Sequence, residues 1–199
     1  MSKITFIEEG HYYLNSKGVI IPSVSELIRF KFPNQYEGVP ERILKNKASY
    51  GTKLHSLVED LFLGKTTLEE INSKKIDPNL KVSCAQAEEL RKKWCIFIQD
   101  SEQIISYQDR YAGTYDLRDM QDEIIDIKTT TEIHEDWIQL QLSLYYLALG
   151  IKKEMGYCLH LPKGKPGRIV AIKTLSHDYC KGVLEEYEKE QINSNWQSR

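Results

Sequence analysis

The stretch of residues 104–129 constrains the fold more than any other part of the sequence, because apolar and polar side chains alternate along it with a period of two. Segments 104–107, 111–117 and 123–129 are separated by short sequences typical of turns, which predicts three consecutive antiparallel strands. A strongly apolar helix is predicted directly after them, over residues 136–149. An α/β or α+β fold follows, with helices packed on a sheet.

Further predicted elements surround this core. Turn signals separate short apolar segments in residues 1–22, which predicts a small N-terminal β-meander. Ser23 and Glu26 form a capping-box pattern that begins a short helix. The other expected elements are helices at 40–64, 66–75, 81–99 and 178–191, a helix break at 77–79, and a hairpin of 155–161 with 169–175. We expect one domain over residues 1–199, with a histidine-bearing helix at 40–64, a catalytic core at 102–175 and a C-terminal helix at 177–199.

The composition limits the classes of function. Lysine plus arginine number 27 and aspartate plus glutamate 29 among the 199 residues, so the formal charge is −2 and the chain as a whole is not basic. Nucleic acid binding would therefore need a local patch or metal ions on an acidic site. No apolar stretch approaches the ~18 residues of a membrane span, and charges interrupt the N-terminus where a signal peptide is apolar, which predicts a cytoplasmic protein. The four cysteines lack zinc spacing and are expected to be free thiols.

Asp126 and Lys128 are the first candidate functional residues. They lie two positions apart on a predicted strand and so share one face, while Ile125 and Ile127 point to the other. A three-residue loop at 120–122 would place Asp116 directly opposite Asp126. A two-residue loop would shift the pairing by one and separate the two carboxylates.

Two carboxylates side by side repel each other, and a divalent cation removes that cost. Oxygen ligands of this kind suit Mg²⁺ or Mn²⁺, and Lys128 could orient a water molecule or stabilise charge on a phosphate. The alternative is a solvated hairpin face with a cross-strand ion pair. Aspartate is disfavoured in strands, however, and Asp126 interrupts an otherwise apolar one.

Two helices carry further candidates. His55 and Glu59 are four residues apart on the predicted helix 40–64, so they share a face on which an imidazole could bind a metal. The alternative for His55 is an ordinary hydrogen-bonded helix histidine. Gln141 and Tyr145 are also four residues apart, on a helix that must pack against the sheet, and they need a polar partner such as a DNA phosphate or the lysine. The alternative is an amphipathic helix surface.

The ordered set of these motifs resembles the PD-(D/E)XK nuclease superfamily, and within it the RecB-like exonuclease branch of the stand-alone phage type. The resemblance covers roughly residues 20–175. It includes a Pro-Ser-Val-Ser segment at 22–25 that is similar to the sequence preceding the histidine helix in that family. The matching motifs are Gly51-Thr-x-x-His55-x-x-x-Glu59, Gly113-Thr-x-Asp116, Asp126-x-Lys128 and Gln141-x-x-x-Tyr145.

The resemblance implies a restriction-endonuclease-like core with a central mixed sheet flanked by helices. It implies that one or two Mg²⁺ or Mn²⁺ ions are bound, and that Lys128 is the catalytic lysine, with Gln141 and Tyr145 positioning both the lysine and the DNA. Lys53 and Thr129, next to the motifs, are expected to contact substrate. An iron–sulfur cluster is not expected, because the close cysteine triplet of the cluster-bearing branches is missing. The metal ligands implied are His55, Asp116, Asp126 and the Ile127 carbonyl, with Glu102 as an outer ligand.

The function implied is a metal-dependent DNA exonuclease for recombination, repair or replication in a bacterial or phage-infected cell. Its partner would be DNA with a free end, and a recombination partner protein and a homo-oligomer stay open. One alternative is an endonuclease of restriction or junction-processing type, which would cut covalently closed DNA. The other is a catalytically quiet DNA-binding module.

Overall fold

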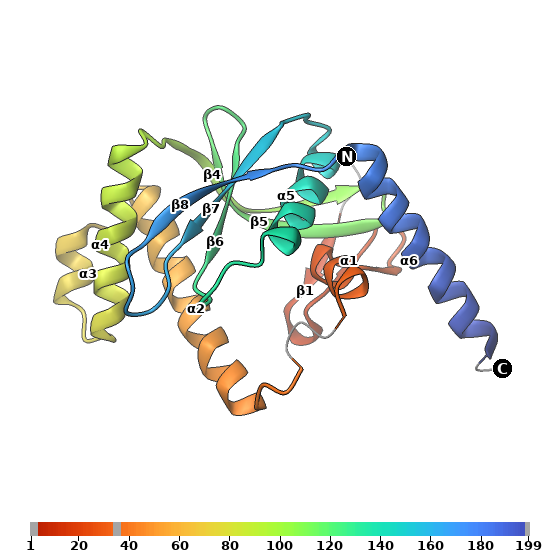
Figure 1. Cartoon of the computed structure of the whole chain (residues 1–199), viewed down its shortest axis with the longest axis horizontal. Coiled ribbons are helices and arrows are strands. Elements are labelled where there is room, and N and C mark those ends of the chain that lie inside the picture. Colours follow the sequence, from red (N-terminus) through yellow and green to blue (C-terminus); the bar gives the residue numbers. More distant parts are fainter. Residues whose placement is uncertain (1–3, 34–36, 198–199) are drawn as a thin grey trace.

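The computed structural model describes residues 4–33 and 37–197, which form two sheets and the helices around them (Figure 1). The order of the larger sheet is β4-β5-β6-β7-β8, antiparallel except for the parallel pair β6–β7, so the expected mixed α/β core is confirmed. The smaller sheet, β1-β2-β3, is the expected N-terminal meander. The strands are β1 (Thr5–Ile7), β2 (Tyr12–Leu14), β3 (Ile20–Ile21), β4 (Ile98–Tyr107), β5 (Tyr111–Asp119), β6 (Ile124–Lys128), β7 (Met155–His160) and β8 (Arg168–Lys173).

The helices cover both faces of the larger sheet. One hydrophobic cluster joins the sheet to α1, α5 and α6, and a second joins it to α2, α3 and α4. Figure 1 shows the second group of helices at one end of the molecule and α6 at the other. The helices are α1 (Val24–Lys31), α2 (Glu41–Phe62), α3 (Leu68–Ser73), α4 (Pro78–Lys93), α5 (Glu135–Leu149) and α6 (His177–Gln197), with a 3-10 turn, η1 (Glu8–Gly10), before β2.

Capping chemistry explains where the first helices begin. The Ser23 hydroxyl accepts the Glu26 N–H and the Glu26 carboxylate accepts the Ser23 N–H, which is the predicted capping box. Thr67 and Glu70 form a second capping box at the start of α3. Local sequence is therefore sufficient to set these two helix starts.

The predicted helix 81–99 is present as α4, but its predicted bounds are wrong at both ends, and residues 77–79, predicted as a break, belong to its start. Asp77 is the N-cap of α4 and Pro78 its first residue, because proline lacks only an N–H that has no partner in the first turn. The helix then ends before Cys95, whose φ of 51° is left-handed, and β4 begins at Ile98 rather than at residue 104. Residues 97–98, which fall within the predicted helix 81–99, therefore lead into the edge strand.

The turn between β5 and β6 sets the register of the candidate site. Leu117 pairs with Ile125, as the three-residue loop predicts, and the Asp119 N–H donates to the Glu123 carbonyl across the loop. Asp122 supplies the left-handed residue that such loops need, with a φ of 61°. The predicted register is therefore confirmed.

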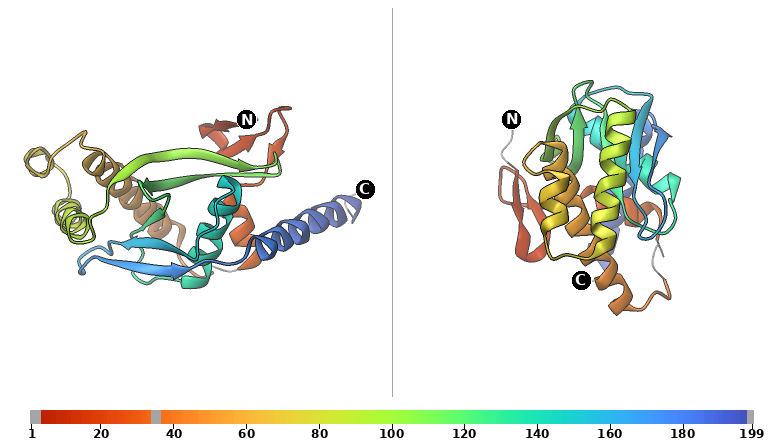
Figure 2. Two further views of the ribbon diagram at one scale, coloured as in Figure 1. Left: turned by 90° about the horizontal axis from the view of Figure 1, so that it is seen from above. Right: turned by 90° about the vertical axis from the view of Figure 1, so that its left-hand side faces the viewer.

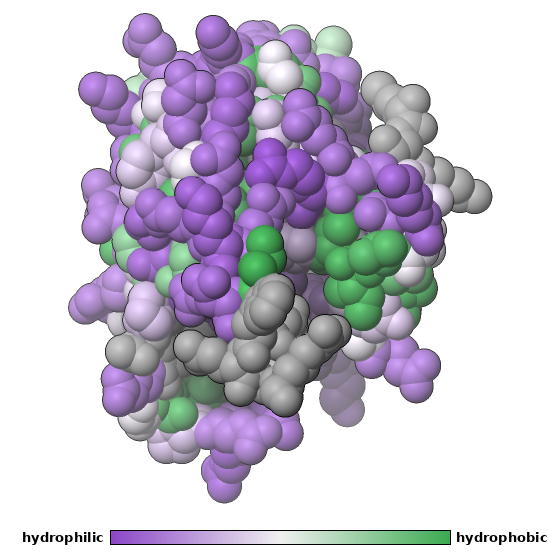
Figure 3. All heavy atoms as spheres, turned by 90° about the vertical axis from the view of Figure 1, so that its right-hand side faces the viewer, coloured by the Kyte–Doolittle hydropathy of each residue, from purple (hydrophilic) through white to green (hydrophobic). Residues whose placement is uncertain are grey.

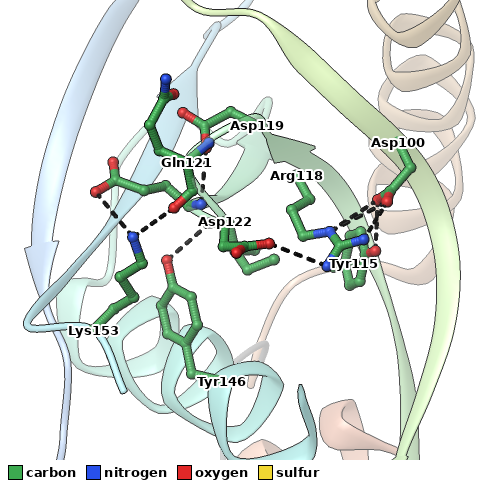
Figure 4. A network of polar contacts seen from close by, with 10 residues as sticks. Asp100, Tyr115, Arg118, Asp119, Gln121, Asp122, Tyr146 and Lys153 are labelled. Carbon is green, nitrogen blue, oxygen red and sulfur yellow. Dashed lines mark hydrogen bonds and ion pairs between the residues drawn. The ribbon is translucent and has the colours of Figure 1, made fainter. Parts of the chain in front are cut away.

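Polar contacts hold this turn from three sides (Figure 4). The Asp119 carboxylate accepts two N–H groups of the loop, at 2.8 Å each. Arg118 forms ion pairs with Asp100 on β4 and with Asp122. The Tyr146 hydroxyl of α5 accepts the Ile124 N–H at 2.8 Å, which links α5 to the first residue of β6.

Beyond the Leu117–Ile125 pair the larger sheet opens. No further ladder pair joins β5 to β6 within the described residues, although β4 and β5 continue together. Figure 2 shows the β4–β5 ribbon diverging from the β7–β8 ribbon, with α5 between them. Asp116 and Asp126 lie where this opening begins.

The surface is mostly polar in the view from the α6 end, with one hydrophobic patch (Figure 3). Exposed hydrophobic side chains include Ile20 at the edge of the small sheet, which is 64% exposed. Within the described residues, no helix combines the length and the apolar character needed to cross a bilayer.

Candidate active site

The carboxylate of Asp116 links α2 to β6. One of its oxygens accepts the Ile127 N–H at 2.6 Å, where a regular sheet would have a backbone carbonyl as acceptor. The other lies 3.5 Å from Nδ1 of His55 on α2. Gly51, one turn earlier on α2, allows this approach, since a Cβ there would lie 3.2 Å from the Thr129 hydroxyl at the end of β6. The close packing of α2 against the end of β6 therefore explains why a glycine is present inside the helix.

The buried Asp126 forms an ion pair with the half-buried Lys128, and Gln141 of α5 contacts both. The Lys128 ammonium lies 2.7 and 2.9 Å from the two oxygens of Asp126, which is 1% exposed. The Gln141 amide donates to Asp126 at 2.8 Å and its carbonyl accepts from Lys128 at 3.1 Å. Of the two partners open to Gln141 on sequence grounds, the lysine is the one it contacts.

Tyr145 carries the network to β5. Its hydroxyl accepts from the Gln141 amide at 3.0 Å and donates to the Thr114 carbonyl at 2.9 Å. Gly113 makes room for the ring, because a Cβ there would lie 3.0 Å from it. The Thr114 hydroxyl in turn lies 2.9 Å from that of Tyr13 on β2, a contact the sequence analysis missed. Tyr13 is in a short, weakly patterned strand, and no local signal marks it as part of the site.

The charged groups in this cluster shift the pKa values of one another. Burial alone would lower the pKa of His55, but the Asp116 carboxylate raises it to about 8. Burial opposes ionisation of Asp116, yet His55 and Lys128 hold its pKa below the ordinary value. Burial and the neighbouring Asp116 raise the pKa of Asp126, against the effect of Lys128. Burial would lower the pKa of Lys128, and the two aspartates raise it. The cluster thus holds two carboxylates and two cationic groups.

Two glutamates lie beside Asp116. Glu102 follows Ser101, which pairs with Leu117, so it falls opposite Asp116 on β4, with a left-handed φ of 50°. Burial, then the charge of Glu102, raises the pKa of Glu59 to about 8. One oxygen of Glu59 is buried without a hydrogen-bond partner among the described residues. Strained backbone and orphaned buried oxygens are more typical of binding sites than of packing.

The donor chemistry suits a hard divalent cation. The charges of Asp116 and Asp126 act on the pKa of His55, and those of Glu102 and Asp116 on that of Glu59, and carboxylate oxygens are the ligands that Mg²⁺ and Mn²⁺ prefer. The unpartnered Glu59 oxygen is the observation that favours binding of a cation here. In the described part of the chain, however, no three such side chains already converge as a metal group, and Lys128 is the cation next to Asp126.

Most of the predicted site residues lie together, and two do not belong to the central cluster. Lys53 is exposed on α2, two positions before His55 and so on nearly the opposite face. It lines a separate groove with Lys75 and Lys163. Thr129 lies at the contact with α2 rather than in the network of Asp126. The residues that the structure brings together are His55, Asp116, Asp126, Ile127, Lys128, Gln141 and Tyr145, with Glu59 and Glu102 next to them.

Two clefts reach residues of the cluster. The Asp116 cleft, about 230 Å³, is lined by Asp116, Glu102 and Tyr145 together with the small sheet. The Lys128 cleft, about 480 Å³, is lined by Lys128 and Gln141 together with α1, α2 and the loop after β6. Ser25 lines both. The first cleft therefore gives access to the Asp116 carboxylate, and the second to the Lys128 ammonium group.

Comparisons with known proteins add little to this geometry. No protein family model and no curated protein matches the chain. A solved structure titled "Crystal structure of SSO0001" is similar over 86% of this chain and 76% of that chain, at 16% sequence identity and a TM-score of 0.47. A likeness of this strength carries no argument about activity, so the function must be argued from the site.

Proposed function

We propose that the protein is a metal-dependent deoxyribonuclease of the PD-(D/E)XK type, which hydrolyses phosphodiester bonds of DNA from an end. The observation that carries the proposal is the largely buried Asp126–Lys128–Gln141 cluster, which lies beside the Asp116–His55 pair where the sheet opens. Burying charged pairs in a core rarely adds stability. The presence of two such pairs, Asp126–Lys128 and Asp116–His55, next to two clefts is better explained by catalysis.

The residues support a division of roles. Asp116 and Asp126, with His55 and the neighbouring glutamates, would hold Mg²⁺ or Mn²⁺. When bound, the ion supplies a water of lowered pKa and charge stabilisation at the phosphate. Lys128 places an ammonium group next to the reacting phosphate, where it can donate a hydrogen bond to a phosphate oxygen or to the attacking water.

Gln141 and Tyr145 are proposed as positioning residues. The Gln141 amide fixes both members of the Asp126–Lys128 pair, and Tyr145 anchors Gln141 to β5. Catalytic groups must be held in narrow geometry, so loss of either contact should lower turnover more than substrate affinity. The preference for a DNA end comes from the resemblance to RecB-like exonucleases.

End-labelled linear DNA and covalently closed circular DNA, incubated with Mg²⁺, Mn²⁺ or EDTA, would test the proposal. We expect degradation of the linear DNA alone, only with metal. Lys128→Met should abolish it, while Lys153→Met should not: Lys153 has a similar exposed fraction, 26% against 28%, but pairs with Glu123 away from the site.

The other outcomes separate the alternatives. Metal-dependent cutting of the closed circle would show an endonuclease. Absence of cleavage by folded protein with either metal, with DNA still bound, would refute a nuclease and leave a DNA-binding module.

A further inference from the structure

The Lys128 cleft has the size and the position of a substrate subsite. Its volume of about 480 Å³ lies in the usual range for ligand cavities, ~300–1,000 Å³. Because Lys128 and Gln141 form part of its wall, whatever fills it lies directly next to the proposed reaction centre. The motifs of the sequence do not account for this cleft.

An aromatic pair lies in the wall of the cleft. The rings of His134 and Trp137 stack with centroids 3.9 Å apart and an interplanar angle of 20°. His134 is exposed at the N-cap of α5 and makes no capping hydrogen bond with its side chain, so its ring is not needed to begin the helix. A flat, partly exposed surface of this kind is how proteins hold unpaired bases.

The cationic side chains of the cleft complement this aromatic pair. Arg29 on α1 and Lys47 on α2 both line it and are exposed, and neither has an ion-pair partner within residues 4–33 and 37–197. Several other lysines, among them Lys31 and Lys163, are paired with carboxylates. Glu132 is the acidic residue that lines the cleft, and it will oppose phosphate there.

We propose that the Lys128 cleft binds an unpaired nucleotide next to the scissile phosphate, with its base packed on the His134–Trp137 pair and its phosphates facing Arg29 and Lys47. Within a duplex the faces of a base are covered by its neighbours, so stacking on the pair needs an unpaired or frayed strand. The proposal rests on the proposed nuclease function and narrows its substrate to DNA with single-stranded ends.

Binding in EDTA tests the cleft without cleavage, using a fluorescent oligothymidylate and a blunt duplex measured by anisotropy. Stacking contributions of this kind predict that Trp137→Ala weakens oligothymidylate binding roughly 5- to 140-fold while duplex binding stays unchanged. Trp94→Ala is the matched control, because Trp94 is 50% exposed at the end of α4, outside the cleft, and should have no effect. His134→Ala should also weaken the single strand selectively, and it decides the matter if Trp137→Ala does not fold.

Unchanged oligothymidylate binding in both folded variants would overturn the proposal. Equal losses for the oligothymidylate and the duplex would overturn it as well, because they indicate a general contact or a structural role. Cleavage in Mg²⁺ reports on the proposed function separately. If the wild type cleaves DNA and both variants bind oligothymidylate normally, the proposed role of the cleft is refuted and the nuclease activity is not. If the wild type does not cleave DNA but Trp137→Ala still weakens oligothymidylate binding, the proposed nuclease activity is refuted and the proposed binding cleft is not.

Discussion

The pairing of His55 with Asp116 predicts an unusual titration in the metal-free protein. Burial lowers the pKa of His55, but the Asp116 carboxylate overcomes that effect and raises it from 6.5 to about 8. The side chain is 26% exposed, so the pair is only partly screened by solvent. The difference corresponds to about 2 kcal/mol of interaction in favour of the protonated imidazole.

The sign of the pH dependence follows from this shift. A folded-state pKa above the unfolded value means that the folded protein binds the proton more tightly. The stabilisation by His55 is therefore fully present below pH 6.5 and is lost as the pH rises through about 8. Asp116→Asn removes the attraction and leaves the burial, so the pKa of His55 should fall below 6.5 in that variant.

The titration can be followed by NMR of the imidazole in EDTA, and the stability by urea unfolding at pH 6 and pH 9. Glu59 also has a raised pKa, about 8, and contributes a loss of stability with the same sign. The comparison should therefore be made between Glu59→Gln and Glu59→Gln with Asp116→Asn. From pH 6 to pH 9 we expect the free energy of unfolding to fall by about 2 kcal/mol more in Glu59→Gln than in the double variant. A His55 pKa at or below 6.5 with Asp116 intact would refute the reasoning.

Three further changes test the packing and charge of the site. Gly113→Ala would place a Cβ 2.7 and 3.0 Å from two neighbouring side chains, so thermal unfolding should show a loss of about 1–3 kcal/mol, and an unchanged midpoint would contradict the close contact. Tyr146→Phe leaves the Ile124 N–H without its acceptor, and denaturant unfolding should show a cost of about 1–3 kcal/mol; a neutral effect would mean that another acceptor replaces it. Lys128→Met leaves Asp126 buried without its cation, which should cost about 3–5 kcal/mol in EDTA and less with Mn²⁺. Equal melting shifts with and without Mn²⁺ would argue against a metal near Asp126.

Local patterns were enough for much of the fold. The capping box at Ser23 and the strands predicted at 111–117 and 123–129 depend on neighbours in sequence, and they are present as expected, the strands as β5 and β6. Asp77 and Pro78 were misread because the same pair can break one helix or begin another. In the structure the Asp77 side chain caps the helix and Leu80 is buried in the cluster that joins α2, α3 and α4 to the sheet, which shows that a helix starts there.

The sequence by itself determined which neighbouring side chains of the candidate site share a face. Spacing on one strand or one helix fixes which residues share a face, so Asp126 with Lys128, and Gln141 with Tyr145, follow from covalent geometry. The three-residue loop, with Asp122 in a left-handed conformation, likewise fixes Asp116 near Asp126.

The tertiary structure alone decided what these side chains contact. The opening of the sheet after Leu117 turns Asp116 toward the Ile127 N–H and His55, and the packing of α5 into that opening brings Gln141 to Lys128. The Lys128 cleft joins α1, α2 and the loop after β6. Such contacts join residues far apart in the chain, and they form because buried polar groups must find partners wherever the packed elements supply them.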